Sequence, residues 1–343
     1  MHVPDGFIDA PVSAATGVVA AGAIAVSLRG ARRELDERTA PLAGLVAAFI
    51  FAVQMLNFPV AAGTSGHLLG GALAAILVGP YTGVLCVSVV LLMQGILFAD
   101  GGLTALGVNI TDMAITTTVV AYAVFRGLVK ILPRSRRSIT AASFLAALLS
   151  VPAAALVFTL LYSLGGTTDV SLGKVATAMI GVHVLIGIGE AAITALTVGA
   201  VIAVRPDLVH GARGLEQRLK LRVNGELVDA PRPLEPVAAR GTSRRRLWIT
   251  GLVASLLLAG FVSFYASSNP DGLEKVAADQ GIDQQAKEHA SADSPFADYG
   301  VRDVDDARLS GGLAGVIGVG VTVVAGTGVF WAVRRRRSTS QAA

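Results

Sequence analysis

The 343-residue sequence contains a single cysteine, Cys86, and charged side chains make up only 15% of it. One cysteine cannot form a disulfide within the chain, which excludes the small secreted folds that depend on several such bonds. Soluble domains carry about 25% charged residues, so this chain has too few charges to cover a water-exposed surface. Its hydrophobicity also excludes intrinsic disorder, because disordered chains lack the apolar residues needed to form a core.

The motifs of several enzyme classes are also missing. The only Gly-Lys pair, Gly173-Lys174, is followed by Val175, and Thr168 stands where a Walker A loop needs its first glycine. There is no HExxH motif and no CxxC motif. We therefore expect that this chain is not an enzyme and does not itself hydrolyse ATP.

Apolar residues dominate what is present. Hydrophobic residues make up 53% of the chain, glycines number 39, and the mean hydropathy is +0.65. A bilayer requires about 20 mostly apolar residues per helix, and only helices or closed barrels satisfy the backbone in lipid. Long continuous apolar runs favour helices, so we predict an all-α, polytopic membrane helical bundle with about nine transmembrane segments, arranged as seven plus two: 11–28, 41–60, 67–80, 81–98, 111–128, 139–164, 174–204, 247–267 and 311–333.

Three of these segments have special features. Segment 67–80 is short and is followed by a proline-separated segment, so it could be a half-helix that does not cross on its own. Segment 174–204 is long enough that it has to tilt, or break at Gly181, Gly187 or Gly189. Pro152 is expected to kink segment 139–164.

Basic residues gather in alternate loops and predict the orientation. Arginines follow the first segment, the fifth and the seventh, and they end the chain: Arg29, Arg32, Arg33, Arg38, Arg134, Arg136, Arg137, Arg244–Arg246 and Arg334–Arg337. Because cytoplasmic loops are rich in Lys and Arg, we expect the N-terminus outside and the C-terminus in the cytoplasm. The acidic loop 268–310 then lies outside. The net charge of +4 is thus a topology signal of a multi-pass membrane protein, and no nucleic-acid partner is expected.

A change of composition divides the chain. Residues 206–246 are polar, basic and rich in proline, which is typical of a cytoplasmic linker. We therefore predict a membrane unit over 1–205 and a two-span unit over 247–343 that contains the outer loop 268–310.

The first two residues could chelate a metal ion. Removal of the initiator methionine is expected to be poor before the bulky His2, which leaves a free α-amine on Met1. This amine, the backbone amide of His2 and its Nδ1 can close a five- and a six-membered ring around one metal ion. Three nitrogens in a plane suit Ni²⁺, Cu²⁺ or Co²⁺, and a fourth ligand is still required. The alternative is that His2 belongs to a frayed chain end.

His67 is the second candidate. It lies in the segment Gly63-Thr64-Ser65-Gly66-His67, on the membrane face where Met1 is expected. A histidine in a membrane segment is costly, and it indicates either a functional site or a hydrogen bond between helices. Thr64 and Ser65 are expected to line the same pocket. Asn109 ends the glycine-rich loop 100–109, which is either an ordinary turn or a support that orients a ligand histidine.

His183 and Glu190 lie two helical turns apart in segment 174–204, with Gly187 between them. They could form an ion path, or they could be polar contacts that join helices, and the small residues around them favour the second reading. His210 and His289 are expected to be solvated rather than ligands.

Several blocks of residues resemble one family. Met1-His2-Val3-Pro4-Asp5-Gly6-Phe7 resembles the opening of the CbiM/NikM substrate-binding components of cobalt/nickel energy-coupling factor transporters. Segments 54–70, 100–107 and 183–190 resemble three further blocks of the family in order. Residues 268–277, which contain Pro270-Asp271-Gly272-Leu273-Glu274, are similar to the PDGLE module, a two-span accessory component that is here fused to the C-terminus.

The resemblance implies a ligand set, partners and a function. The metal would be held by the amine of Met1, the amide and imidazole of His2, and the imidazole of His67. The partners would be a transmembrane coupling subunit and two ABC ATPase subunits, supplied as separate chains, together with the lipid bilayer of a prokaryotic cell membrane. The function would be capture of Ni²⁺ or Co²⁺ as transported substrate, without an organic cofactor. The alternative is a proton-coupled secondary divalent-metal transporter that uses His183 and Glu190.

Overall fold

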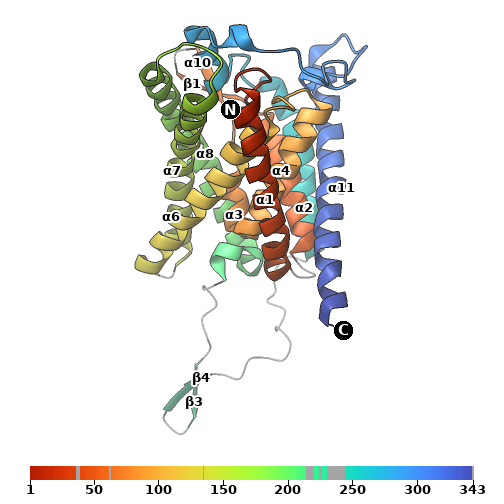
Figure 1. The fold of residues 1–343 in the computed structure, drawn as a ribbon. Coiled ribbons are helices and arrows are strands. Elements are labelled where there is room, and N and C mark those ends of the chain that lie inside the picture. The colour runs from red at the N-terminus through yellow and green to blue at the C-terminus, as the bar shows by residue number, and fades with distance from the viewer. Residues whose placement is uncertain are drawn as a thin grey trace.

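The computed structural model describes residues 1–35, 39–61, 63–133, 135–213, 220–223, 226–229 and 244–341. It is nearly all-α and contains a bundle of long helices, most of which run roughly along one direction (Figure 1). The N-terminus lies at the upper end of this bundle in Figure 1, and the C-terminus lies at the lower end.

Nine helices build most of the bundle, with a π-helical segment between two of them: α1 (Ala10–Glu34), α2 (Ala40–Gln54), α3 (Gly71–Val78), α4 (Pro80–Leu97), α5 (Leu106–Asn109), η1 (Ile110–Thr116, π-helical), α6 (Thr117–Ile131), α7 (Arg136–Gly165), α8 (Leu172–Val204) and α11 (Ala307–Gln341). The remaining helices are α9 (Arg244–Gly260) and the short α10 (Gly272–Gln280). Short 3-10 turns join several of these elements: η2 (Pro206–Leu208), η3 (His210–Ala212), η4 (Val262–Tyr265), η5 (Asp283–Gln285) and η6 (Ala297–Tyr299).

Among the described residues, seven helical segments are long and apolar enough to cross a membrane, with α5, η1 and α6 forming one of them. Large apolar side chains point outward along these helices, including Val18 and Leu196, each 74% exposed. Such surfaces require lipid rather than water around them, which agrees with the predicted polytopic membrane bundle.

Two expected segments are shorter than the sequence predicted. Helix α2 ends at Gln54, whereas a helix was expected over 41–60. The chain then forms a small hairpin of β1 (Phe58–Ala61) and β2 (Thr64–Gly66), which was not predicted. Pro59 cannot continue a helix, and Gly63 with φ of 74° forms the turn.

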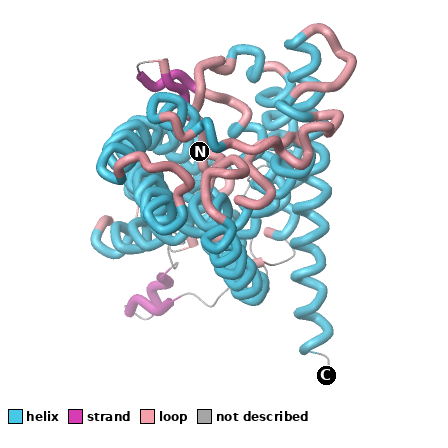
Figure 2. The backbone as a smooth tube through the Cα atoms, turned by 45° about the horizontal axis from the view of Figure 1, so that its top comes forward, coloured by secondary structure: helices cyan, strands magenta, loops and turns pink. Residues whose placement is uncertain are grey.

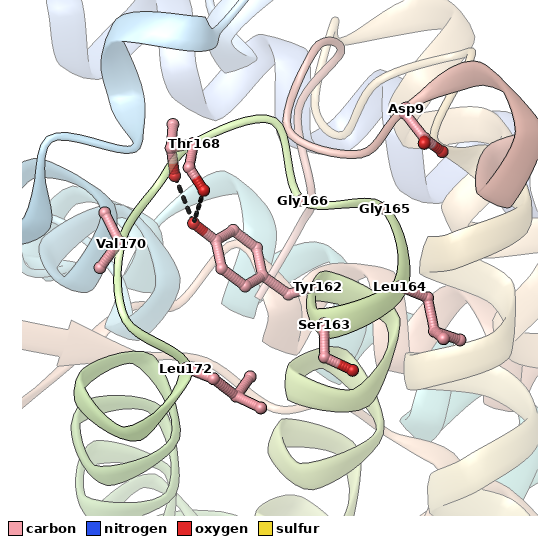
Figure 3. A pocket seen from close by; sticks show the side chains of 9 residues that line it. All are labelled: Asp9, Tyr162, Ser163, Leu164, Gly165, Gly166, Thr168, Val170 and Leu172. Atoms are coloured by element: carbon pink, nitrogen blue, oxygen red, sulfur yellow. Dashed lines mark hydrogen bonds between the residues drawn. The ribbon is translucent and has the colours of Figure 1, made fainter.

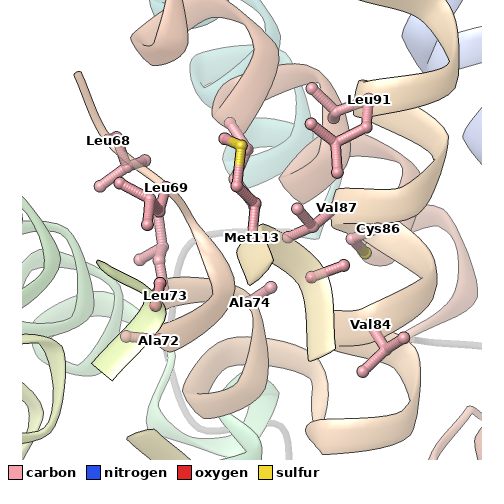
Figure 4. Close-up of a cluster of buried hydrophobic side chains, with 14 of the residues drawn as sticks. Leu68, Leu69, Ala72, Leu73, Ala74, Val84, Cys86, Val87, Leu91 and Met113 are labelled. Carbon is pink, nitrogen blue, oxygen red and sulfur yellow. The ribbon is translucent and has the colours of Figure 1, made fainter. Parts of the chain in front are cut away.

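Helix α3 is the half-helix that segment 67–80 suggested. It has eight residues, and every one of them is buried. Gly70 precedes it with φ of 92°, and Gly79 follows it with φ of 106°, which are backbone conformations that favour glycine. Pro80 then begins α4 as its first helical residue. The side chains of α3 pack against α4 and η1, where Leu73, Val87 and Met113 belong to one buried cluster (Figure 4).

Helices α7 and α8 form a long pair. Helix α8 runs unbroken through Gly181, Gly187 and Gly189, so the break, which was one of the two alternatives, does not occur in this described segment, and α7 continues through Pro152. A Cβ on Gly189 would clash with the ring of Phe58, so only glycine allows the β1–β2 hairpin to approach α8 this closely.

The predicted linker over 206–246 lies largely outside the described residues. Its described parts are the turns η2 and η3, a hairpin of β3 (Lys220–Val223) and β4 (Glu226–Asp229), and residues 244–246, which already belong to helix α9. Arg38 and Arg134, two of the arginines used for the orientation, also lie outside the described residues.

Residues 244–341 form a C-terminal unit that packs beside α2. Helix α11 runs along α2 over much of its length, as Figure 1 shows, and α9 contacts both. Between α9 and α11, residues 268–306 cross the upper end of the bundle, where many loops gather around the N-terminus (Figure 2).

Candidate metal site

The first residues of the chain are buried in the upper end of the bundle. Met1 is 2% exposed, Val3 is fully buried and His2 is 9% exposed. The side chain of Asn109 accepts a hydrogen bond from the Val3 amide at 2.7 Å and donates to the Val3 carbonyl at 3.1 Å. The amide of Gly102 donates to the same carbonyl at 2.9 Å. The terminus is therefore fixed on both sides of its backbone, and the alternative of a frayed end does not describe this structure.

The predicted nitrogen donors meet at this point. The amine of Met1 lies 2.6 Å from Nε2 of His67, and the rings of His2 and His67 meet edge to face with centroids 5.2 Å apart. Nδ1 of His67 lies 3.0 Å from the carbonyl of Leu68 and can donate its proton there. In this arrangement Nε2 is unprotonated and its lone pair accepts from the Met1 amine, and an unprotonated Nε2 is the form of imidazole that binds a metal.

Two carboxylates that were not predicted as site residues join these nitrogens. Oδ2 of Asp271 lies 2.5 Å from the Met1 amine and 3.5 Å from Nε2 of His67. Oδ1 of Asp100 lies 2.8 Å from Nδ1 of His2, and the hydroxyl of Tyr299 donates to Oδ2 of Asp100 at 2.6 Å. Asp271 and Tyr299 both belong to the C-terminal unit, more than 200 residues from the amine, so no local spacing pointed to them. The Pro270–Glu274 block was the one available signal.

The electrostatics of the site follow from this pairing. Burial alone would raise the pKa of Asp271, but the charge of the Met1 amine and the contacts with His67 hold it well below its usual range. In the same way, burial opposes ionisation of Asp100, while the charge and hydrogen bond of His2 and the Tyr299 hydroxyl lower its pKa to about 2. Burial and the charge of the amine lower the pKa of His67. The site therefore combines two ionised carboxylates with an imidazole that stays neutral.

Helix α10 fixes the direction of the Asp271 side chain. Oδ1 accepts a hydrogen bond from the Glu274 amide at 2.9 Å, and Oε2 of Glu274 accepts one from the Asp271 amide at 2.8 Å. This reciprocal capping box satisfies the first turn of α10. One carboxylate oxygen is thus used for the helix, and the other faces Met1.

The predicted pocket residues take different roles. Ser65 donates its hydroxyl to the carbonyl of Asn269 at 2.8 Å, and its amide donates to the carbonyl of Pro270 at 2.9 Å. It thereby holds the chain just before Asp271 rather than lining the metal pocket, and Thr64 is a buried residue of β2 that does not line it either. Asn109 holds the backbone of Val3 and so positions the neighbouring His2.

Glu190 and His183 are fully buried in α8 and contact different partners. The carboxylate of Glu190 accepts hydrogen bonds from the amides of Leu69 at 2.7 Å and Gly70 at 3.1 Å. Nδ1 of His183 lies 2.7 Å from the carbonyl of Met179, one turn earlier in its own helix. Glu190 therefore holds the segment that leads from His67 into α3.

The two remaining histidines are less solvated than expected. Nε2 of His210 lies 3.3 Å from the Tyr122 hydroxyl, at the lower end of the bundle. Nε2 of His289 donates to the carbonyl of Gly101 at 3.2 Å, and the Ser291 amide donates to its Nδ1 at 2.9 Å. Both side chains are half-buried, since His210 contacts α6 and His289 contacts the loop that contains Gly101.

The predicted ligands His2 and His67 line one of two cavities. One, of about 330 Å³, lies at the loop between α7 and α8, where the Tyr162 hydroxyl bonds to Thr168 (Figure 3). None of the predicted site residues lines it. The other, of about 620 Å³, is lined by His2, His67, Asp100, Asp271 and Tyr299 among other residues, and it leads to the Met1 amine. The second cavity is the candidate functional site.

Side chains alone do not complete a metal site here. Among the described residues, no group of three or more His, Cys, Asp or Glu side chains is arranged to hold an ion. A metal site at this point would need the backbone nitrogens predicted from the sequence, namely the Met1 amine and the His2 amide, in addition to the imidazoles.

Comparison with known proteins adds a family to this geometry. The model of the cobalt uptake substrate-specific transmembrane region, CbiM, matches residues 2–208. The chain belongs to the CbiM family. A PDGLE domain model matches residues 245–335, so this CbiM-family chain also carries a PDGLE domain.

Relatives of this CbiM-family chain include separate and fused proteins. A putative fused nickel transport protein NikMN of Archaeoglobus fulgidus is 38% identical over 254 residues, which cover 70% of this chain and 82% of the relative. A putative metal transport protein of Haloquadratum walsbyi is 40% identical over 209 residues, which cover 61% of this chain and 93% of the relative. A crystal structure of a transition metal transporter has a TM-score of 0.53 at 27% identity and covers 60% of this chain and 93% of its own.

Proposed function

We propose that this chain captures Ni²⁺ or Co²⁺ as the substrate-binding component of an ATP-driven importer. Support comes from the CbiM model and from relatives described as nickel and cobalt transport proteins. The observation that carries the proposal is the contact of 2.6 Å between the Met1 amine and Nε2 of His67, which brings together two nitrogens 66 residues apart.

The chemistry of these donors fits such an ion. The Met1 amine, the His2 amide and Nδ1 of His2 form two fused chelate rings, and Nε2 of His67 supplies a fourth nitrogen. Nitrogen donors in a plane suit Ni²⁺, and imidazole is also a good ligand for Co²⁺. To reach this arrangement the ion displaces protons from the amine and the amide, and His2 exchanges its contact with Asp100 for the metal.

Energy and partners are part of the same proposal. We propose that a transmembrane coupling subunit and two ABC ATPase subunits act with this chain, because its own sequence has no Walker A motif. We also propose that the N-terminal end of the bundle faces outward, as the arginine distribution predicts, so that the ion enters from outside.

Extending the chain at its N-terminus tests the amine directly. Several residues added before Met1 convert its amine into a backbone amide, which binds a metal only after losing a proton of much higher pKa and which no longer ends the chain in the buried site, so we expect the Ni²⁺ affinity to fall sharply in titration calorimetry. The same residues added after Ala343 are the control and should leave binding unchanged. An N-terminally extended protein that binds Ni²⁺ with the affinity of the original chain would refute the proposed site.

Reconstitution tests the energy source. The chain in vesicles without ATPase subunits should bind Ni²⁺ but not accumulate it. Accumulation driven by a proton gradient alone would favour the secondary transporter instead, with His183 and Glu190 as the first residues to examine.

A further inference from the structure

The carboxylate of Asp271 has one oxygen that the fold of its own unit does not use. Oδ1 caps α10 through the Glu274 amide, whereas Oδ2 faces the Met1 amine at 2.5 Å and Nε2 of His67 at 3.5 Å. Both of these nitrogens belong to the proposed donor set. An atom that contacts two donors of one ion lies at or beside the position of that ion.

The backbone around Asp271 is held firmly in this position. The carbonyls of Asn269 and Pro270 accept hydrogen bonds from Ser65, two residues before His67. A Cβ on Gly272 would lie 2.8 Å from Cδ1 of Ile186 and 3.1 Å from Cε1 of His183, so α10 begins in close contact with α8. Asp271 is therefore fixed relative to the same loop that carries His67.

Other contacts of the C-terminal unit reach the N-terminal segment as well. The Lys287 amide donates to the Asp5 carbonyl at 2.8 Å, and the amide of Asp298 donates to the Phe98 carbonyl at 2.9 Å, next to the loop that contains Asp100. These bonds place the acidic loop 268–310 against the cavity that contains His2 and His67, and Asp271, Glu274 and Asp298 line that cavity.

Charge and coordination both favour an oxygen ligand here. Four nitrogens in a plane leave the positions above and below the plane open. A divalent ion in a site sheltered from water is stabilised by a carboxylate, and nickel and cobalt accept oxygen ligands as fifth or sixth donors.

We propose that Asp271 is a metal ligand that the PDGLE domain supplies, so that the ion is bound by nitrogens of the CbiM region and by Oδ2 of Asp271. This inference rests on the proposed function. It makes the C-terminal unit part of the binding site itself, and it predicts that the ion is five- or six-coordinate rather than planar.

Ni²⁺ distinguishes these two coordination states. A planar four-nitrogen Ni²⁺ site is diamagnetic, whereas a carboxylate above the plane gives a paramagnetic ion with weak long-wavelength absorption bands. We expect the full-length protein loaded with NiCl₂ to show the paramagnetic form.

The test compares D271N with D283N in the full-length chain. Asparagine is as good a helix N-cap as aspartate, so D271N retains the bond to the Glu274 amide but loses the anionic oxygen. We expect D271N to bind Ni²⁺ with affinity lowered by about tenfold or more and to show a diamagnetic, planar spectrum. Asp283 is exposed in the same unit, and D283N should match the original protein.

The outcomes separate this inference from the proposed function. An original protein that binds Ni²⁺ in the planar, diamagnetic form would overturn the role of Asp271 and leave the nitrogen site intact. The same conclusion would follow if D271N kept both the affinity and the spectrum. An original protein that binds no Ni²⁺ would instead defeat the proposed function. If D271N unfolds in detergent, D271S replaces it, because serine also caps a helix but has no carboxylate, and an affinity and spectrum equal to those of the original protein would count against the inference.

Discussion

The Met1 amine shows how much a single residue depends on its surroundings. An amine at a chain end is ordinarily hydrated and mobile. Here it is buried between an imidazole and a carboxylate, at 2.6 Å and 2.5 Å, and the next residues are held by Asn109 and Gly102. The ability of Met1-His2 to chelate a metal ion comes from these two residues alone. Whether an ion can reach them depends on contacts made by four other residues.

His210 lies far from the candidate metal site, and its burial predicts how stability depends on pH. Burial, together with the charges of Arg213 and Arg126, lowers the pKa of His210 to about 4, and Tyr122 is its polar neighbour. In the unfolded chain the imidazole has its ordinary pKa of about 6.5. This contribution to the stability of the folded state is therefore complete above about pH 6.5, and the free energy of unfolding decreases as the pH falls towards about 4, because the unfolded state then binds a proton that the folded state does not.

Thermal unfolding in detergent measures this effect. Between pH 7 and pH 5 the original protein should lose more thermal stability than a His210→Gln variant, which has no group to protonate. Equal losses in the two proteins would show that burial of His210 does not contribute to the pH dependence.

The short helix α3 links the packing of the helices to the position of His67. It is too short to cross a membrane, and its buried N-terminus exposes backbone N–H groups that need partners. Glu190 of α8 supplies them by accepting from the amides of Leu69 and Gly70. Because His67 lies only two residues before Leu69, this contact also determines where its imidazole is placed.

Glu190→Gln tests this positioning role. Glutamine has one acceptor oxygen, so one of the two amides loses its partner and the segment from His67 to α3 loosens. We expect the number of bound Ni²⁺ ions to stay the same while the affinity falls by about tenfold and transport is impaired.

The matched control is Glu288→Gln, the same substitution at an exposed loop position, and it should change none of these quantities. Loss of the bound ion in Glu190→Gln, as seen by metal analysis, would mean that Glu190 is a ligand and not a support.

At the scale of the whole molecule, the C-terminal unit is packed onto the bundle and is not merely attached by a linker. Helix α11 lies along α2, and glycines allow the two to approach closely. A Cβ on Gly318 would clash with the ring of Phe51 and lie 2.9 Å from Phe98, whereas one on Gly320 would meet no atom within 4 Å. This packing holds the PDGLE domain at a fixed distance from the metal site.

Gly318→Leu should therefore destabilise the protein. Forcing a large side chain into a packed interface costs on the order of 1–3 kcal/mol, so we expect a lower Tm in detergent and weaker Ni²⁺ binding. Gly320→Leu adds the same side chain two residues away on the exposed surface and should leave both unchanged. If the two variants have the same Tm, the α2–α11 contact does not stabilise the molecule.

Hydropathy predicted much of the fold. Of the nine apolar segments predicted, seven are helices able to span a membrane in the described residues, whereas 41–60 and 67–80 contain the shorter helices α2 and α3, and the shortness of 67–80 indicated the half-helix. The end of α2 at Gln54 was missed because residues 55–60 are apolar enough to prolong a helix, and only their pairing with residues 64–66 makes them a hairpin. Apolar composition alone does not distinguish these two backbones.

Hydropathy and blocks of neighbouring residues were enough to predict the membrane class and the family, and with the family resemblance they predicted Met1, His2 and His67 as nitrogen donors. Only the folded structure shows that Asp271 and Asp100 lie beside these nitrogens and that Glu190 holds the segment after His67. Asp271 meets the Met1 amine across 270 positions, and such a contact depends on how α10 packs on α8. Contacts of this kind are set by the packing of whole helices, which no local pattern of residues encodes.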